Sequence, residues 1–232
     1  MGKHFEGKAV IVTGSSSGIG QTTAVTFAKA GANVETIQLI EKAGVSKDRV
    51  AAVLGSLEDE KTLKQLVDTA IQKFGRIDVL VNAAGIGTKP NTPPESVENY
   101  DFVMNVNFKA PTFLTLLCVP HLEKTKGNVV NVSSPTQMGF YGLAKAALDH
   151  STRQFAITLA PKGIRVNTLS PGLVRTAFQE RMMPGEGGKA FIDEFEKTIP
   201  EMADAIKYLA GPKAAYMTGQ MIVQDGGTSL KH

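Results

Sequence analysis

The stretch KAVIVTGSSSGIG, residues 8–20, decides the fold of this chain. Its first part, Lys8–Val12, is a short apolar run rich in β-branched side chains, which predicts a buried strand. A glycine-rich turn follows, and the helical stretch Gln21–Ala30 begins at once and is closed by Gly31. A strand that passes through glycines directly into a helix is an arrangement whose exposed backbone N–H groups bind phosphate.

The same strand–helix order continues along the chain. Further strands are predicted at 50–54, 77–81, 129–132, 164–169 and 221–223, and helices at 58–74, 96–122 and 141–160. The strands are unbroken apolar runs and do not alternate with polar residues, which is typical of strands covered by helices on both faces. The pattern therefore predicts an α/β fold with a doubly wound, Rossmann-type parallel sheet in three α/β/α layers. No repeat or linker divides the chain, so we expect a single domain over residues 1–232.

The turn between the first strand and the first helix is a candidate phosphate-binding site. Glycine suits a tight turn, a close approach of backbone to pyrophosphate, and close packing of helix on strand. The spacing is Gly-x3-Gly-x-Gly, and not the more common Gly-x-Gly-x2-Gly. Serines within the turn add hydroxyl donors and can cap the helix. The alternative is a tight turn without a ligand, but its place between strand and helix favours the phosphate site.

A tyrosine and a lysine one helical turn apart form a candidate acid/base pair. Tyr141 and Lys145 share a helix face, and no other tyrosine in the chain has lysine four residues later. An adjacent ammonium is expected to lower the pKa of the phenol towards a useful range. An ordinary surface pair is the alternative. The pair follows the strand 129–132 and two serines, however, at the sheet edge where such folds bind ligands.

These motifs, taken in order, resemble the landmarks of the single-domain short-chain dehydrogenases/reductases. The resemblance covers about residues 8–228, and it includes the glycine turn, NAAG at 82–85, Asn107, Ser133-Ser134, Tyr141-x3-Lys145 and PG at 171–172. It implies hydride transfer between NAD(P)(H) and a carbonyl or secondary alcohol, with Tyr141 as acid/base. It also implies that Lys145 holds the nicotinamide ribose, that Ser134 hydrogen-bonds the substrate oxygen, and that Asn107 completes a proton relay.

The resemblance further implies which residues contact the cofactor. Asn82 and Gly85 would bring backbone near the adenine ribose, and the segment 171–176 would cover the nicotinamide. Ala83 stands where many family members have a second asparagine, and Ser56 where an adenine-contacting aspartate is common. The full set of expected cofactor contacts is Gly14, Ser16, Ser17, Gly18, Ile19, Gly20, Asn82, Ala83, Gly85, Tyr141, Lys145, Pro171, Gly172, Val174 and Thr176.

Three stretches are shorter than the family pattern, at 34–35, 134–141 and 199–201. The first leaves only Ala32–Val34 for the second strand, with Glu35 already assigned to a helix end. With no acid at the expected end of that strand, NADP is favoured over NAD. All three stretches border the predicted cleft. One interpretation is that mobile loops are missing from the printed sequence; the alternative is a truncated, inactive relative.

Composition and charge narrow the remaining function classes. A net charge of +3, spread along the chain, gives no basic run for a nucleic-acid or membrane surface. The single cysteine, Cys118, lies in an apolar run and is expected to be buried and inert, and no metal site is predicted. No membrane span or targeting signal is apparent, so a cytoplasmic location is the default expectation.

The expected partners are a small carbonyl or alcohol substrate and further copies of the chain. The family resemblance implies a homo-oligomer, a dimer or tetramer, packed through helices near residues 100–120 and 141–160. Residues 177–200 are expected to form a hinged lid over the substrate, and their Met and Phe residues indicate an apolar substrate. Two other functions remain: a non-catalytic dinucleotide-binding sensor or scaffold of the same fold, and a methyltransferase with its cofactor at the glycine turn.

Overall fold

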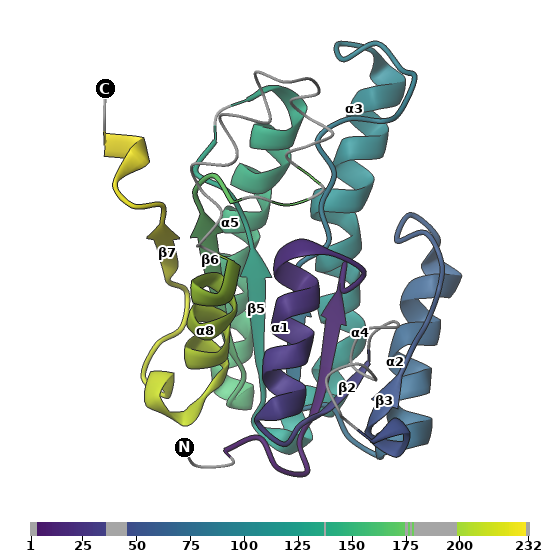
Figure 1. The fold of residues 1–232 in the computed structure, drawn as a ribbon, viewed down its shortest axis with the longest axis vertical. Coiled ribbons are helices and arrows are strands. Elements are labelled where there is room, and N and C mark those ends of the chain that lie inside the picture. The colour runs from purple at the N-terminus through teal and green to yellow at the C-terminus, as the bar shows by residue number, and fades with distance from the viewer. Residues whose placement is uncertain are drawn as a thin grey trace.

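The computed structural model describes residues 4–35, 46–136, 138–174, 176, 178 and 199–230. Within these residues one parallel sheet has the strand order β3-β2-β1-β4-β5-β6-β7 (Figure 1). The order reverses between β1 and β4, which is the switch point where open α/β sheets bind ligands. The strands are β1 (Ala9–Thr13), β2 (Asn33–Glu35), β3 (Val50–Ala51), β4 (Val79–Asn82), β5 (Asn128–Val132), β6 (Arg165–Pro171) and β7 (Met221–Gln224).

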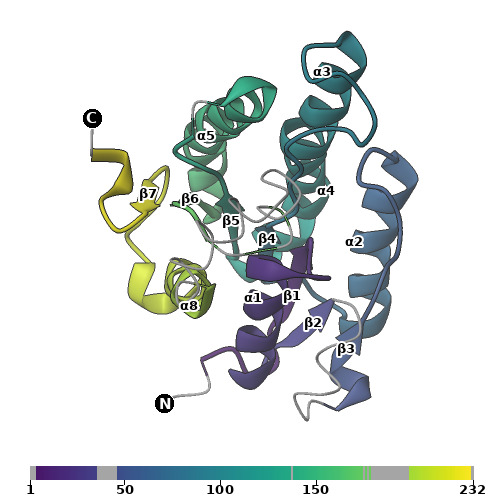
Figure 2. The same ribbon diagram turned by 45° about the horizontal axis from the view of Figure 1, so that its top comes forward.

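Helices cover both faces of this sheet, as the sequence predicts. Figure 2 shows α1 (Gly18–Lys29) and α8 (Ile199–Ala210) on one face. The other face carries α2 (Glu60–Phe74), α4 (Ala110–Thr125) and α5 (Gly139–Leu159). Helix α3 (Val97–Met104) projects beyond the carboxyl ends of the strands (Figure 1). The doubly wound α/β/α architecture is therefore confirmed.

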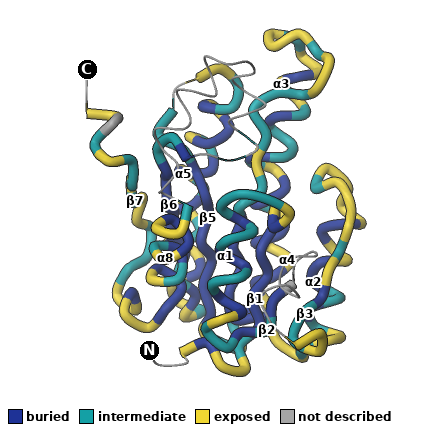
Figure 3. Tube along the Cα trace, viewed as in Figure 1, coloured by how far each residue is buried: buried dark blue, intermediate teal, exposed yellow. Residues whose placement is uncertain are grey.

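The core lies on the two faces of the central strands (Figure 3). In β1, Val10 and Val12 pack towards α1 and α8, whereas Ile11 packs towards α2 and α4. All five residues of β1 are buried. Because successive side chains of a strand point to opposite faces, a strand covered on both sides must be apolar at every position. This packing accounts for the unbroken β-branched runs in the sequence.

Several element boundaries differ from the sequence prediction. The second strand includes Glu35, which was assigned to a helix end, and it pairs in register with Ile11 of β1 and Ala51 of β3. The third strand is only Val50–Ala51, shorter than the predicted run to Leu54. Helix α8 was not predicted, and it packs against α1 over much of its length. In each case long-range pairing or packing, and not local pattern, sets the boundary.

The three shortened stretches are only partly within the described residues. Val34 and Glu35 are neighbours in β2, and Pro200 and Glu201 are neighbours in α8. The third stretch contains Gln137, which lies outside the described residues. The lid predicted over 177–200 also lies outside them, apart from Phe178, Ile199 and Pro200.

One continuous helical stretch, Val97–Thr125, is long and apolar enough to cross a membrane by length and composition. It comprises α3, a π-turn at Asn105–Lys109, and α4. Val103, Leu114 and Leu122 are buried within the domain, and α4 contacts α2 and α5. Core helices of globular domains meet the same length and composition criteria, so this stretch is weak evidence for a membrane span.

Candidate active site

A cavity of about 960 Å³ opens at the carboxyl ends of β1, β4, β5 and β6. Its wall begins at the glycine turn after β1 and continues through the segments that follow β4, β5 and β6. Parallel strands place their carboxyl ends at one edge of the sheet, so segments distant in sequence meet there. Most of the residues expected at the site line this cavity: Gly14, Ser16, Ser17, Gly18, Ile19, Gly20, Ala83, Gly85, Ser134, Tyr141, Lys145, Pro171, Gly172, Val174 and Thr176.

The glycine turn closes tightly against the rest of the site. Gly14 has φ +68°, and a Cβ atom there would lie 2.7 Å from the Cα of Ala84. A Cβ on Gly20 would lie 2.5 Å from the carbonyl oxygen of Gly14, so only glycine allows α1 to start so close to β1. Gly18 packs in the same way against Thr176. The turn is thus in contact with both the β4 and the β6 segments of the wall.

Thr13, at the end of β1, ties this turn to the segment after β4. Its hydroxyl oxygen accepts hydrogen bonds from the backbone N–H groups of Ala83 (3.1 Å) and Ala84 (3.2 Å). Asn82 is not among the residues that line the cavity. Its side-chain amide donates inward to Asn131 of β5 at 2.8 Å, so Asn82 joins two central strands while Ala83 and Gly85 face the cavity.

The N-terminus of α1 fits the pyrophosphate of a dinucleotide. Ser17 is its N-cap residue, with extended backbone and no side-chain capping bond in the described residues. The N–H groups of the first turn therefore face the cavity with the positive end of the helix dipole. No acidic residue lies in that turn to compete with a phosphate. The cavity volume and the close-packed glycines are consistent with an extended nucleotide.

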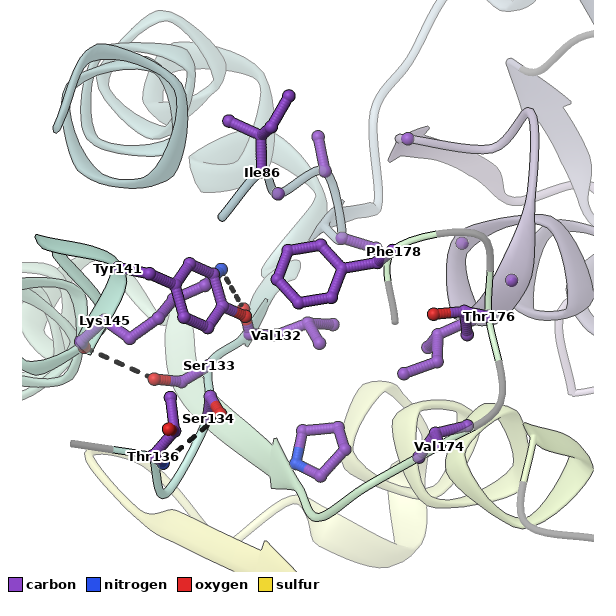
Figure 4. Close-up of a pocket in the computed structure, with 18 of the residues that line it drawn as sticks. Ile86, Val132, Ser133, Ser134, Thr136, Tyr141, Lys145, Val174, Thr176 and Phe178 are labelled. Carbon is purple, nitrogen blue, oxygen red and sulfur yellow. Dashed lines mark hydrogen bonds between the residues drawn. The ribbon is translucent and has the colours of Figure 1, made fainter. Parts of the chain in front are cut away.

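Tyr141, Ser134 and Lys145 meet at the other end of the cavity (Figure 4). The Ser134 hydroxyl hydrogen-bonds with the Tyr141 phenol. Lys145 Nζ donates to the carbonyl oxygen of Val132 at 2.8 Å and lies 5.5 Å from the centre of the Tyr141 ring. The end of β5 and the first turns of α5 thus bring two hydroxyls and an ammonium together.

The pKa values at this end of the cavity differ from the sequence expectation. Burial raises the pKa of Tyr141 well above its ordinary value, and the hydrogen bond with Ser134 opposes that shift. Burial also lowers the pKa of Lys145 to about 8, opposed by the charge of Asp149. The expected lowering of the Tyr141 pKa by Lys145 is therefore not seen in the protein alone. The reason is that burial disfavours the charged form of both groups.

Asn107 lies behind the cavity wall in the π-turn Asn105–Lys109, and it is fully buried. Its amide nitrogen donates to the carbonyl oxygens of Val103 and Ile86, both at 2.8 Å. Its side-chain oxygen accepts from the N–H of Ile86 at 3.1 Å. A Cβ on Gly85 would lie 3.1 Å from that oxygen and 3.5 Å from Lys145 Nζ. The helix is distorted by a π-turn at Asn107, and the Asn107 oxygen and Lys145 Nζ both lie beside Gly85.

The segment after β6 closes the opposite side of the cavity. Pro171, Gly172, Val174 and Thr176 all face it. Gly172 approaches the C-terminal turn so closely that a Cβ would lie 2.6 Å from the Cβ of Asp225. Arg175 and Ala177 lie outside the described residues.

Several residues of the site were missed from sequence. Phe178 packs on Tyr141, with ring centres 5.0 Å apart (Figure 4), and Ile86, Met138 and Leu173 add apolar surface. No local pattern distinguishes these residues from ordinary core residues. Asp149 could have been found, because it follows Lys145 at the same four-residue spacing that identifies the Tyr141–Lys145 pair.

Comparison with known proteins places this chain in one family. Residues 14–229 match the family model described as enoyl-(acyl carrier protein) reductase. The 3-oxoacyl-acyl-carrier-protein reductase FabG of Thermotoga maritima is 35% identical, covering 96% of this chain and 98% of the relative. A short-chain dehydrogenase/reductase of Caenorhabditis elegans, solved with cofactor, is 37% identical with a TM-score of 0.88, covering 98% of this chain and 97% of that chain.

A further relative bears on chain length. Oxidoreductase UcpA of Salmonella typhimurium is 34% identical over 256 aligned positions, more than the 232 residues of this chain, and the match covers 99% of this chain and 97% of the relative. That relative therefore has residues at aligned positions where this chain has none. The chain belongs to the short-chain dehydrogenase/reductase family and is an NAD(P)-dependent oxidoreductase that transfers a hydride between the cofactor and a carbonyl or alcohol substrate.

Proposed function

We propose that Tyr141 exchanges a proton with the substrate oxygen and that Ser134 orients that oxygen. The convergence of Ser134, Tyr141 and Lys145 on one cavity, with Lys145 Nζ 5.5 Å from the centre of the Tyr141 ring, carries this assignment. When bound, the nicotinamide supplies or accepts the hydride. In carbonyl reduction Tyr141 gives its phenolic proton to the substrate oxygen, and in alcohol oxidation it removes that proton. Burial keeps the phenol protonated until a charged group or ligand reaches it.

The remaining assigned residues bind or position. Lys145 would hold the nicotinamide ribose, and its ammonium would favour the Tyr141 phenolate once both groups contact the ligand. Asn107 would support the proton path through its oxygen near Lys145. The glycine turn and the N-terminus of α1 would bind the pyrophosphate. Ala83, Gly85 and the 171–176 segment would hold the adenosine and nicotinamide ends.

The first experiment compares Tyr141→Phe with Tyr100→Phe, a matched substitution on α3 outside the cavity. NAD(P)H oxidation is followed with a panel of ketones, and cofactor binding by calorimetry. Tyr141→Phe is expected to lose at least about a hundredfold in kcat, the usual contribution of acid/base catalysis, while cofactor affinity stays within a few fold. Turnover retained in Tyr141→Phe would contradict the assignment. Cofactor binding without turnover in the unmodified protein would favour the sensor or scaffold.

The choice between NAD and NADP depends on the end of β2. NADP was expected because no acid was assigned to this strand, but the described part of β2, Asn33–Glu35, includes an acid about 20 residues after Gly14. A carboxylate at this position favours the ribose 2′-hydroxyl of NAD and repels the 2′-phosphate of NADP. We therefore propose NAD as the cofactor. The measurement is the ratio of Kd values for the two cofactors in the unmodified protein and in Glu35→Gln, which should bind NADP more tightly.

A preference for NADP in the unmodified protein, or an unchanged ratio of Kd values in Glu35→Gln, would contradict the Glu35 assignment.

We propose an apolar carbonyl or secondary alcohol as the substrate. Phe178 packs on Tyr141, and Met138, Ile86 and Leu173 line the same cavity. Cyclic and aromatic ketones are expected to give a higher kcat/KM than polyhydroxylated sugars, and the reverse order would contradict this proposal. The lid over 177–200 stays a prediction, as does the single domain over 1–232.

We also propose a homo-oligomer, dimer or tetramer, in the cytoplasm. Helices α4 and α5 expose Phe113, Leu116, Leu143 and Ile157, and such apolar surface favours burial between subunits. Light scattering should give a multiple of 24.7 kDa, and a charge introduced by Leu116→Glu should lower it. A monomer in both proteins would contradict the proposal, and cell fractionation tests the location.

A further inference from the structure

Asp149 lies one helical turn beyond Lys145 on the buried face of α5. Only 8% of Asp149 is exposed. Its Oδ1 atom is buried and has no hydrogen-bond partner among the described residues. A buried carboxylate oxygen without a partner is unfavourable. Stability alone therefore does not explain an acid at this position, which is next to the proposed catalytic pair.

The groups around Asp149 connect it to Lys145. Ser133, at the end of β5, hydrogen-bonds with the Asp149 side chain. The same hydroxyl donates to the carbonyl oxygen of Lys145 at 3.3 Å (Figure 4). A hydroxyl has one proton, so the carboxylate of Asp149 and the carbonyl oxygen of Lys145 are alternative acceptors for it, and the carboxylate is the stronger of the two. Ser133 thus lies between Asp149 and the backbone of Lys145.

Among the described residues, the charged groups that act on Asp149 are both on α5. Burial raises the pKa of Asp149. Lys145, four residues before it, and Arg153, four residues after it, oppose that shift and favour its ionised form. The neighbouring elements add uncharged groups: Thr168 of β6, which bonds to Thr152 of α5, and Asn107 of the π-turn near Lys145. Helix α3 meets the start of α5 through Tyr100, which packs on Phe140.

We propose that Asp149 is a positioning residue, whose carboxylate keeps Lys145 protonated and accepts a hydrogen bond from Ser133, the residue after β5. The proposal rests on the roles assigned above to Tyr141 and Lys145. Burial lowers the pKa of Lys145 to about 8, and Asp149 is the charge that opposes this shift. Without that charge Lys145 loses its proton at a lower pH. The ammonium beside Tyr141 is then lost within the physiological range.

The test is the pH profile of carbonyl reduction, a reaction that requires both the Tyr141 phenol and the Lys145 ammonium to be protonated. Asp149→Asn keeps the shape of the side chain and removes the charge. We expect its alkaline limb of kcat to move about one unit to lower pH, with kcat about fivefold lower at pH 8 and near normal at pH 6.5. KM and cofactor affinity should change little. Asp101→Asn, an exposed acid on α3, is the matched control and should follow the unmodified protein.

Three results would overturn the proposal: an unshifted profile in Asp149→Asn, an equal loss at every pH, or the same shift in Asp101→Asn. If Asp149→Asn does not fold, Asp149→Glu decides, because it keeps the charge. Its alkaline limb must stay at the position seen in the unmodified protein even if kcat falls, and a shifted limb contradicts the proposal. Tyr141→Phe distinguishes failure of this proposal from failure of the proposed function. If Tyr141→Phe is inactive while the pH profile of Asp149→Asn is unshifted, only the role of Asp149 is contradicted. If Tyr141→Phe is active, the proposed function itself is contradicted.

Discussion

The contact between Gly14 and Ala84 joins the two halves of the nucleotide site, and Gly14→Ala tests it. Gly14 has φ +68°, and an added Cβ would lie 2.7 Å from Ala84 Cα and 2.8 Å from Ala84 N. Comfortable contact between carbon atoms is about 3.5–4 Å, so the segments must separate by roughly 0.8 Å or more. Both neighbouring atoms belong to the backbone, and no rotamer change can relieve the clash.

The magnitude follows from two separate costs. An alanine in the left-handed region costs about 1–2 kcal/mol, and forcing an atom into a packed site costs about 1–3 kcal/mol. Gly14→Ala should therefore destabilise the protein by about 2–5 kcal/mol. Gly75→Ala is the matched control, because Gly75 has φ +73° at the end of α2 and nothing within 4 Å of an added Cβ. It should show the first cost alone, about 1–2 kcal/mol.

Urea unfolding measures both free energies, and calorimetry measures the Kd for the cofactor. Gly14→Ala should weaken cofactor binding by about tenfold or more, equivalent to about 1.4 kcal/mol, because the turn moves away from the β4 segment. Gly75→Ala should leave the Kd unchanged. Equal stability loss in the two variants, with an unchanged Kd in Gly14→Ala, would refute the close approach.

Three further outcomes are expected. Lys145 has a pKa of about 8 in the folded protein against an ordinary value of 10.5, so between these pH values the unfolded chain binds one more proton than the folded protein. The free energy of unfolding should therefore rise from pH 8 to pH 10.5 by about 3 kcal/mol, and urea titrations of Lys145→Met should lack this rise. Phe178→Ala should raise the KM of an apolar ketone by about tenfold with less effect on a polar one, since it removes the ring packed on Tyr141; an unchanged KM would remove Phe178 from the substrate wall. Asn107→Ala breaks three hydrogen bonds to Ile86 and Val103 and should cost about 3 kcal/mol in a thermal or urea assay; a loss below 1 kcal/mol would contradict this network.

The sequence was most informative where the chemistry depends on near neighbours in the chain. The strand–glycine–helix order of residues 8–31 predicted the nucleotide-binding fold, because a 3.6-residue helix period and a buried strand leave local patterns. The four-residue spacing of Tyr141 and Lys145 placed both on one helix face for the same reason. The strand ends at Thr13 and Val132 then predicted one shared cavity, since parallel strands end at the same edge of a sheet.

Sequence reasoning failed where a property depends on contacts between distant segments. Glu35 belongs to β2 through its pairing with Ile11 and Ala51, and nothing in the local pattern required it. The direction of the Asn82 side chain, about which the sequence made no prediction, is likewise set by Asn131 on the neighbouring strand, which accepts its hydrogen bond. These outcomes follow from sheet register, which is set by the whole set of strand pairs.

By itself the sequence determined the fold class, the glycine turn and the hydroxyl–phenol–amine set, because each rests on residue type and short spacing. Only the tertiary structure decided the electrostatics of that set. Burial raises the pKa of Tyr141 and lowers that of Lys145, and it places Asp149 as the opposing charge. The burial of a group depends on all the segments that pack around it, such as Phe178, which packs on Tyr141. These segments are distant in the sequence, so no local stretch predicts the resulting pKa.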